Sequence, residues 1–312
     1  MNELRSERGQ TAVLTVMFLA ALLGMAALVL DVGSWMREQR ATQAAADAAA
    51  LAAAQALPDS PGQADVLAAS YLDKNGGGTA TVTFTSKNTA SDTVSVRVER
   101  NAPGFFAKLF GVDSVDVSAK ATARATGLDQ AKWVAPIVVN IKHPKLNCGS
   151  SGGKPVPCFG DATELQLEHL HKPGSGDAAG AFGLINLDRS DSGSVGGSTL
   201  GDWISQGFDQ YMPLGEYTSV PSAMFNDSHV KGALDFRMND VLLFPIYKTI
   251  TGSGSNAIYD IVGWVAFKVT SFQASGSTGK VFGSFTEVIW EGVGSQSGSG
   301  MNYGVRAIEL VE

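Results

Sequence analysis

Two histidines give the sequence its closest approach to a metal site. His169 and His171 flank Leu170 after Glu168 in the stretch LEHLH, and in a strand both imidazoles would lie on one side. Zinc sites take at least three protein ligands, and no third ligand is identifiable from the spacing. Solvated surface histidines explain the pair with fewer assumptions, so we predict no metal site here.

Other patterns that could support catalysis are also incomplete. The acidic stretch from Asp188 to Asp191 lacks the Asp/Asn series and the terminal Glu of a dedicated calcium loop. The segment from Gly252 to Gly254 matches only part of a G-x-S-x-G nucleophile elbow, and a Gly/Ser-rich turn accounts for it. The sequence contains no Walker-type phosphate loop. We therefore predict a non-enzymatic protein with no catalytic residues, no bound metal and no cofactor.

The two cysteines indicate a structural role. Cys148 and Cys158 bracket the turn-rich segment GSSGGKPVP, so a bond between them would close a small loop. As nucleophiles they would need a partnering base that the sequence does not supply, and no CxxC spacing or nearby histidine completes a four-ligand metal set. We predict a disulfide, with two free thiols as the alternative. Because disulfides persist in oxidising compartments, the bridge favours an extracytoplasmic location for this half of the chain.

Length and charge limit the classes of function. The chain has 312 residues, and its 44% hydrophobic content is enough for about two domains with cores of their own. Its net charge is −7 and its pI is near 5.1. A nucleic-acid partner would require a clustered excess of Lys and Arg, so we exclude nucleic acid as the main partner.

The elements that position these residues begin with an apolar run. Residues 11–30, TAVLTVMFLAALLGMAALVL, contain no charged side chain, and as a helix they would span about 30 Å, the thickness of a bilayer's hydrocarbon core. A cleavable signal peptide is the main alternative, but the polar stretch 31–40 shows no obvious small-x-small cleavage site. We predict a membrane anchor that includes Thr11, Leu14, Phe18, Leu22, Leu28 and Leu30.

Flanking side chains do not decide the orientation of this anchor. Arg5 and Arg8 on one side balance Arg37 and Arg40 on the other, so the positive-inside rule gives a tie. The predicted disulfide breaks the tie in favour of an extracytoplasmic C-terminal region. Trp35, just beyond the run, fits an interfacial aromatic anchor.

An alanine-rich stem is expected to continue the helix. Residues 41–56 contain 11 alanines in 16 positions, and alanine has the best intrinsic helix propensity. We expect the helix to reach Leu57 and to stop at Pro58. Small side chains permit close approach of a neighbouring helix from another chain, and packing on the stem's own domain is the alternative. The candidate packing residues are Ala45, Ala49, Ala52 and Ala56.

Beyond Pro58 the patterns predict an α+β fold. In residues 58–126 they indicate a small layer of helices over an antiparallel sheet, with helices at 62–73 and 105–111 and strands at 79–85, 92–99 and 114–126. Residues 127–312 are rich in glycine and mainly β, which suggests a sandwich or a barrel. There we predict strands at 134–141, 241–250, 259–269 and 281–290, a helix at 202–211 and a loop at 190–201. The expected domains are thus 1–57, 58–126 and 127–312.

Three segments resemble the TadE/TadG-like proteins of the Flp, or tight-adherence, pilus system. They are RGQTAVLTVMFLAALLGMAALVLDVG at 8–33, QAAADAAALAAAQAL at 43–57, and PGFFAKLFG followed by VSAKATARA within 103–125. The resemblance implies a single-pass protein of the inner or cytoplasmic membrane with its N terminus in the cytoplasm, and it is closest to the longer TadG-like branch. It implies that the partners are the membrane and other pilus-assembly or pilin-like proteins. A homo-oligomer is the alternative assembly.

One departure from related pilins bears on processing. Such pilins are cleaved after a glycine and carry a glutamate at the fifth residue of the mature chain, whereas cleavage after Gly9 would put the apolar Leu14 there. We therefore favour a permanently anchored component over a polymerising pilin. Asp31, the only acid in the anchor region, is interpreted as solvated. The alternative function is a membrane-anchored extracytoplasmic binding, adhesin or hydrolytic module.

Overall fold

The computed structural model describes residues 4–151, 154–167, 181–189, 195–252, 256–275, 279–295 and 301–311. The chain divides into two units, which we describe one at a time. Unit 1 comprises residues 1–86, 91–124 and 310–312, and unit 2 comprises residues 87–90 and 125–309. Both units combine helices with mainly antiparallel strands, which confirms the predicted α+β class.

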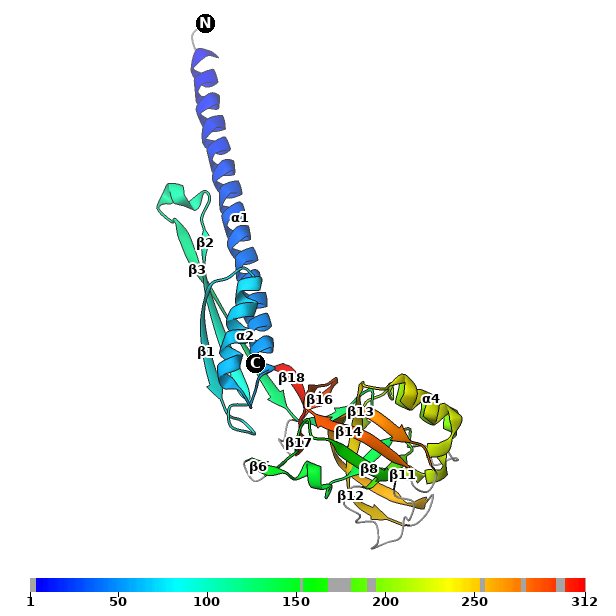
Figure 1. The fold of residues 1–312 in the computed structure, drawn as a ribbon. Helices are drawn as coiled ribbons and strands as arrows, with labels where there is room; N and C mark the ends of the chain where they lie inside the picture. The colour runs from blue at the N-terminus through cyan, green and yellow to red at the C-terminus, as the bar shows by residue number, and fades with distance from the viewer. Residues whose placement is uncertain are drawn as a thin grey trace. The chain divides into compact units, whose positions relative to one another are not determined.

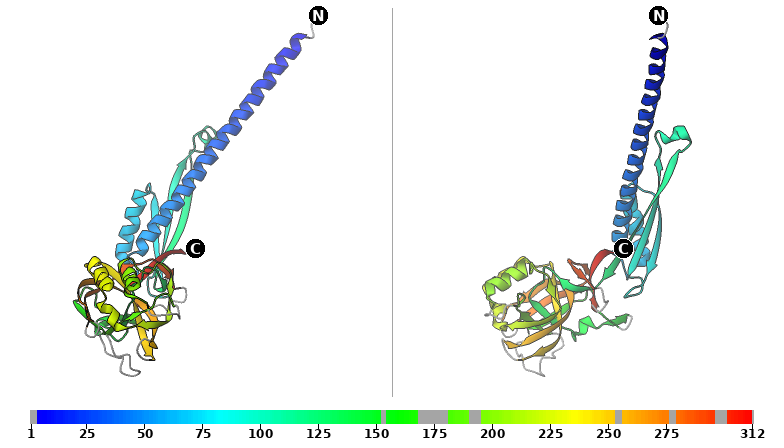
Figure 2. Two further views of the ribbon diagram at one scale, coloured as in Figure 1. Left: turned by 90° about the vertical axis from the view of Figure 1, so that its right-hand side faces the viewer. Right: turned by 180° about the vertical axis from the view of Figure 1, so that it is seen from behind.

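Unit 1 is built on one long helix. Its elements are α1 (Leu4–Ala54), α2 (Pro61–Lys74), β1 (Thr79–Thr85), β2 (Thr93–Pro103), the 3-10 helix η1 (Ala107–Phe110) and β3 (Ser114–Thr126). Strands β1, β2 and β3 are hydrogen-bonded neighbours in this order within a larger sheet, both pairs are antiparallel, and η1 lies at the tip of the β2–β3 hairpin. Figures 1 and 2 show α2 and the sheet beside the C-terminal half of α1, while the N-terminal half extends alone.

Alternation of side chains explains why β2 can face the helices. Val94, Val96 and Val98 are fully buried on one face, as the period of two in a strand requires. Arg97 and Glu99 point the other way and form an exposed ion pair. The predicted bounds of β1 and β3 are confirmed, and the predicted helix at 62–73 corresponds to α2.

Unit 2 contains a closed β-barrel. Its strands run in the order β12-β13-β14-β8-β9-β5, with β5 parallel to β12, β8 parallel to β9 and the other neighbours antiparallel. A further strand, β11, pairs with both β13 and β9. The bounds are Ile137–Asn140 (β5), Thr163–Leu167 (β8), Ala181–Ile185 (β9), Gly215–Val220 (β11), Val241–Thr251 (β12), Ile258–Gln273 (β13) and Lys280–Thr286 (β14).

Shorter elements complete the described part of unit 2. The short strands are β4 (Leu128–Ala131), β6 (Gly149–Ser151), β7 (Lys154–Val156), β10 (Met212–Pro213), β15 (Val288–Ile289), β16 (Gly292–Gly294), β17 (Met301–Tyr303) and β18 (Val305–Val311). The helices are η2 (Pro144–Leu146), α3 (Gly197–Ser205), η3 (Ser222–Asn226) and α4 (Ser228–Phe236). Strands β4, β10 and β16 form a small antiparallel sheet.

Aromatic side chains fill much of the core of the barrel. Phe244, Phe267 and Phe285 are fully buried, with ring centroids 5.5 Å apart for the first two and 5.2 Å apart for the last two. Leu200 of α3 and Leu234 of α4 belong to the same apolar cluster. Burial of this cluster supplies the main driving force for folding unit 2.

The four predicted strands of the second half correspond to β5, β12, β13 and β14, but the predicted helix was wrong in its bounds. We placed it at Asp202–Tyr211 after a loop over Ser190–Gly201, whereas α3 begins at Gly197 and ends at Ser205. The helix ends early because Gly207 adopts a left-handed φ of +83°, and a Cβ there would lie 2.6 Å from the Cα of Trp133. Residues 190–194 of the predicted loop lie outside the described residues.

Helix α4 was not predicted from the sequence. Its N-cap is Asp227, whose carboxylate accepts a hydrogen bond from the backbone N–H of His229 at 2.8 Å.

Unit 2 contains a buried histidine, His143. His143 is only 4% exposed, and its ring packs edge-on against Phe285 with centroids 5.5 Å apart. Burial lowers the pKa of His143 and the charge of Lys145 lowers it further, although a hydrogen bond with the Glu164 backbone opposes the shift. The unfolded chain therefore binds more protons than the folded chain between the lowered pKa and about 6.5.

We predict that unit 2 loses stability as the pH falls below about 6.5, because protonation then favours the unfolded chain. The measurement is denaturant unfolding of the full chain in detergent at pH 7 and pH 5, followed by near-ultraviolet circular dichroism. A His143→Gln variant, which cannot titrate, should show a weaker pH dependence. An equal dependence in the two proteins would contradict the assignment to His143.

Candidate functional site: the anchor, the stem and the hairpin tip

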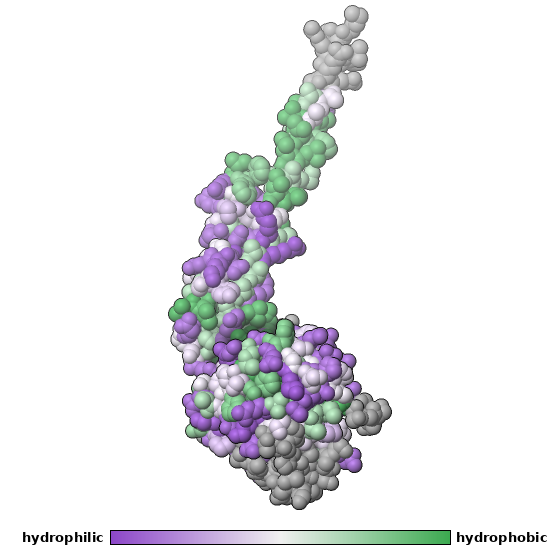
Figure 3. Space-filling view, turned by 45° about the vertical axis from the view of Figure 1, so that its right-hand side comes forward, coloured by the Kyte–Doolittle hydropathy of each residue, from purple (hydrophilic) through white to green (hydrophobic). Residues whose placement is uncertain are grey.

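The N-terminal half of α1 exposes a continuous apolar surface. From Gln10 onward the helix is long and apolar enough to cross a membrane. All six predicted anchor residues are exposed, with Phe18 at 66% and Leu28 at 65%. Figure 3 shows this segment as a green, apolar rod. Soluble proteins rarely expose so large an apolar area, so the segment fits a membrane anchor.

The alanine-rich stem is buried inside unit 1. Ala45 and Ala49 are 0% exposed and Ala52 is 1% exposed, whereas Ala56, which follows the end of α1, is partly buried. This part of α1 packs against α2 and β2, and the small side chains of its alanines allow these elements to approach closely. The burial of Ala45, Ala49 and Ala52 favours packing of the stem on its own domain over packing on another chain.

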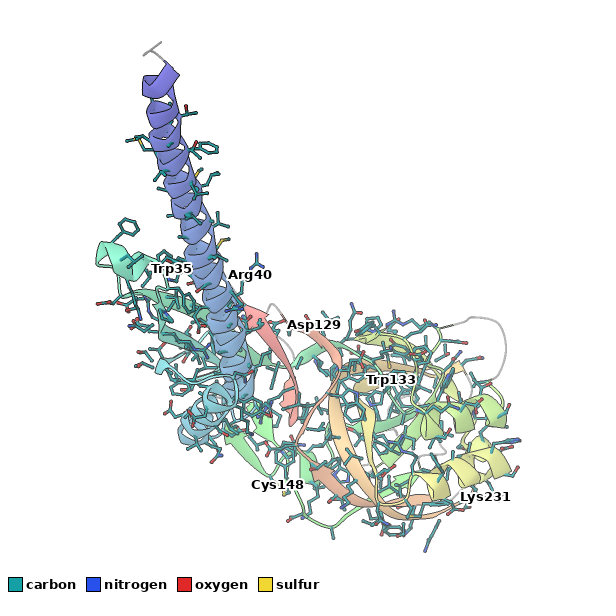
Figure 4. The ribbon with its side chains drawn as sticks, turned by 90° about the horizontal axis from the view of Figure 1, so that it is seen from above. Trp35, Arg40, Asp129, Trp133, Cys148 and Lys231 are labelled. Atoms are coloured by element: carbon teal, nitrogen blue, oxygen red, sulfur yellow. A yellow bond between two sulfur atoms is a disulfide. The ribbon has the colours of Figure 1, made fainter. Side chains whose placement is uncertain are left out.

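Polar side chains of α1 fix the β2–β3 hairpin along the stem. Trp35 donates from Nε1 to the Pro103 carbonyl at 3.2 Å, and Gln39 donates from Nε2 to the Ser118 carbonyl at 2.8 Å. Figure 4 labels Trp35 on α1 at the level of the hairpin. These bonds tie both strands of the hairpin to the same helix.

Asp31 makes the most extensive contact between the helix and the hairpin. Its carboxylate accepts backbone N–H groups of Phe105 at 2.8 Å, Phe106 at 3.0 Å and Ala107 at 2.5 Å. These donors lie at the start of η1, so Asp31 caps a 3-10 helix distant in sequence. The predicted solvated role of Asp31 was wrong, because the hairpin tip covers the side chain and leaves it 2% exposed.

Apolar side chains at the hairpin tip point away from the rest of unit 1. The exposed fractions are 62% for Phe105, 42% for Phe106, 82% for Leu109, 80% for Phe110 and 41% for Val112. We call these five residues the apolar tip. The sequence indicated a short amphipathic helix at 105–111, and the shorter η1 lies within that range. The sequence pattern did not indicate that these apolar side chains would remain exposed.

The predicted disulfide is present in unit 2. Cys148 and Cys158 are bonded, with their Cα atoms 5.5 Å apart (Cys148 is labelled in Figure 4). Between them, β6 and β7 form a small antiparallel pair. The backbone N–H of Cys158 donates to the Lys145 carbonyl at 2.9 Å, which joins the loop to the segment before it.

Most of the remaining candidate residues of unit 2 cannot be placed in the structure. Within the described residues, no group of three or more His, Cys, Asp and Glu side chains could hold a metal ion. The predicted pair His169 and His171, together with Glu168 and Asp191, lies outside the described residues, as do residues 253 and 254 of the Gly/Ser-rich turn.

An open groove of about 560 Å³ in unit 2 is lined by Arg189, Tyr217 and neighbouring residues. The Arg189 guanidinium lies 4.2 Å from the centre of the Tyr217 ring and donates to the Leu214 carbonyl at 3.3 Å. The Tyr217 hydroxyl donates to the Pro213 carbonyl at 2.7 Å, and burial raises the pKa of Tyr217 to about 12. Residues in the walls of the groove thus engage both the Arg189 guanidinium and the Tyr217 hydroxyl.

These features define a class of protein in which one helix able to span a membrane carries an α+β region beyond it. Residues 9–56 match the model of a family described as putative Flp pilus-assembly TadE/G-like. The match covers the anchor and the stem. No curated protein and no solved structure matches the chain.

We predict that Asp31→Ala loosens the hairpin tip, because three backbone N–H groups lose their acceptor. Hydrogen exchange of the full chain in detergent, read by mass spectrometry, should show severalfold faster exchange in peptides covering residues 103–112. Asp47→Ala is the matched control on the same helix, since Asp47 accepts a bond from the Gln43 side chain and none from the hairpin tip. Equal exchange rates in the two variants would show that Asp31 does not hold the hairpin tip in place.

We predict that replacing both cysteines by serine destabilises unit 2. The bond joins residues separated by 10 positions, and the loop-entropy model assigns such a closure about 3 kcal/mol. Denaturant unfolding should show this loss, and wild-type protein unfolded in the presence of reductant should behave like the double variant. A loss well below about 1 kcal/mol would mean that the unfolded loop is already restricted.

Proposed function

We propose that this protein is a non-enzymatic, membrane-anchored component of a Flp, or tight-adherence, pilus-assembly apparatus. The observation that carries the proposal is the coincidence of two findings on one segment. The family match covers residues 9–56, and the same segment contains both the exposed apolar rod and the buried stem. The helix thus serves as the anchor, and the regions beyond it make the contacts with other pilus proteins.

The disulfide supports an orientation with the C-terminal region outside the cytoplasm. Because the bond between Cys148 and Cys158 persists in an oxidising compartment, unit 2 would be extracytoplasmic and the N terminus cytoplasmic. Unit 2 also adds a large β-barrel region beyond the matched segment, which favours the longer TadG-like branch.

The anchor is proposed to stay in the membrane rather than enter a polymerised filament. Leu14 occupies the position where a related pilin cleaved after Gly9 would carry a glutamate. The buried alanines of the stem are committed to unit 1, so contacts with pilus partners are assigned to the exposed anchor and to the extracytoplasmic surfaces.

The test deletes the gene from a bacterium that carries it and counts surface pili by electron microscopy. We expect loss of Flp-type pili in the deletion strain and recovery with the wild-type chain. Leu19→Arg with Leu23→Arg should fail to restore them, because two charges in the middle of a membrane helix oppose insertion by several kcal/mol. Leu19→Ile with Leu23→Ile is the matched control and should restore them.

Pili at normal numbers in the deletion strain would refute the proposed function. The orientation is tested separately with a membrane-impermeant thiol reagent on intact cells. Labelling only after reduction places Cys148 and Cys158 outside, whereas labelling only after lysis, without reductant, places unit 2 in the cytoplasm.

A further inference from the structure

The apolar tip lies next to the point where the charge-free part of α1 ends. Asp31 directly follows Leu30, the last residue of the 20-residue run without charges. Its carboxylate holds the backbone of Phe105 and Phe106. Figure 3 shows green surface at the hairpin tip beside the green surface of α1, so the two apolar surfaces adjoin.

The hairpin cannot slide freely along the helix. The Trp35 side chain bonds the Pro103 carbonyl, one turn of α1 beyond Asp31, and Gln39 bonds Ser118 one further turn away. If α1 spans a bilayer, the contacts of Asp31, Trp35 and Gln39 with the hairpin would place the apolar tip at the boundary between hydrocarbon and headgroups.

We propose that the apolar tip inserts into the lipid interface of the leaflet in which the α1 anchor ends, as a second attachment of unit 1 to the membrane. The proposal requires the membrane anchor but not the pilus assignment. Its ligand is the headgroup and upper acyl-chain region of the bilayer. The exposed Lys108 lies between the apolar residues in the sequence and suits contact with lipid phosphates.

Lipid accounts for the position and the size of the apolar tip. Aromatic and other apolar side chains bind membranes at the interface, where segments bury about 5 to 10 Å into the headgroup boundary. A single 3-10 turn such as η1 is short enough to be buried to that depth and too short to reach deeper. The surface is also continuous with that of the anchor, whose lipid-facing role the helix itself implies.

The test measures where a fluorophore at the apolar tip resides. The full chain carrying Leu109→Cys is labelled with an environment-sensitive dye without reductant, so that the native disulfide remains closed. It is then reconstituted into phosphatidylcholine–phosphatidylglycerol vesicles. Quenching is compared between doxyl groups on the lipids and iodide supplied on both sides of the membrane.

Two further labelled variants serve as references. Val66→Cys lies on α2 and is also an exposed apolar position, at 59%, but it belongs to the part of unit 1 beside the stem. Phe18→Cys lies within the anchor run. We expect lipid doxyl groups to quench the dyes at Leu109 and Phe18 at least severalfold more than the dye at Val66. Iodide should show the reverse order.

Each other outcome overturns the proposal in a recognisable way. If the Leu109 dye behaves like the Val66 dye while the Phe18 dye is lipid-quenched, the anchor stands and the tip is in water. If the Leu109 dye is shielded from both quenchers and the shielding grows with the protein-to-lipid ratio, a second copy covers the tip. If the Phe18 dye also escapes lipid quenching, the anchor fails and the insertion fails with it.

Discussion

The carboxylate of Asp31 must be satisfied at the end of a helix segment that otherwise carries no charge. The side chain is only 2% exposed, so its hydrogen bonds must come from protein. The β2–β3 hairpin supplies them by folding its tip over the helix and donating three backbone N–H groups. The length of the hairpin, which stays paired from Thr93 to Pro103, follows from the need to reach that position.

The alanines of the stem hold the rest of unit 1 close to α1. A helix that carries large apolar residues along the stem would hold α2 and β2 at a distance, whereas Ala45, Ala49 and Ala52 let them pack closely. One helix therefore meets two environments with two kinds of residue. Large apolar side chains face outward in its first half, and small ones face its own domain in the second.

Local patterns located the elements of unit 1 but not all of their ends, since α1 ends at Ala54 rather than Leu57 and β2 continues to Pro103 rather than Glu99. They were insufficient for its contacts. The alternation of β1 and β3 and the charge-free run 11–30 are short-range features, and their bounds could be predicted. The bond from Phe105 to Asp31 joins residues 74 positions apart, and no periodicity reports such a pairing. In unit 2 the strands β5, β12, β13 and β14 were recognisable, whereas β8, β9 and β11 were not predicted. The end of α3 was misplaced because it depends on the approach of Gly207 to Trp133, far away in the sequence. Closure of the barrel likewise rests on pairings between distant strands.

The continuity of α1 from Leu4 to Ala54 has a mechanical consequence. A helix without a break acts as a stiff lever, and about 35 Å of it lie beyond Asp31 at 1.5 Å per residue. Membrane helices commonly tilt by about 20°, and a tilt of that size would swing the far end of the stem sideways by roughly 12 Å. A thinner or thicker bilayer would change the tilt of α1 and would therefore displace the far end of the stem sideways.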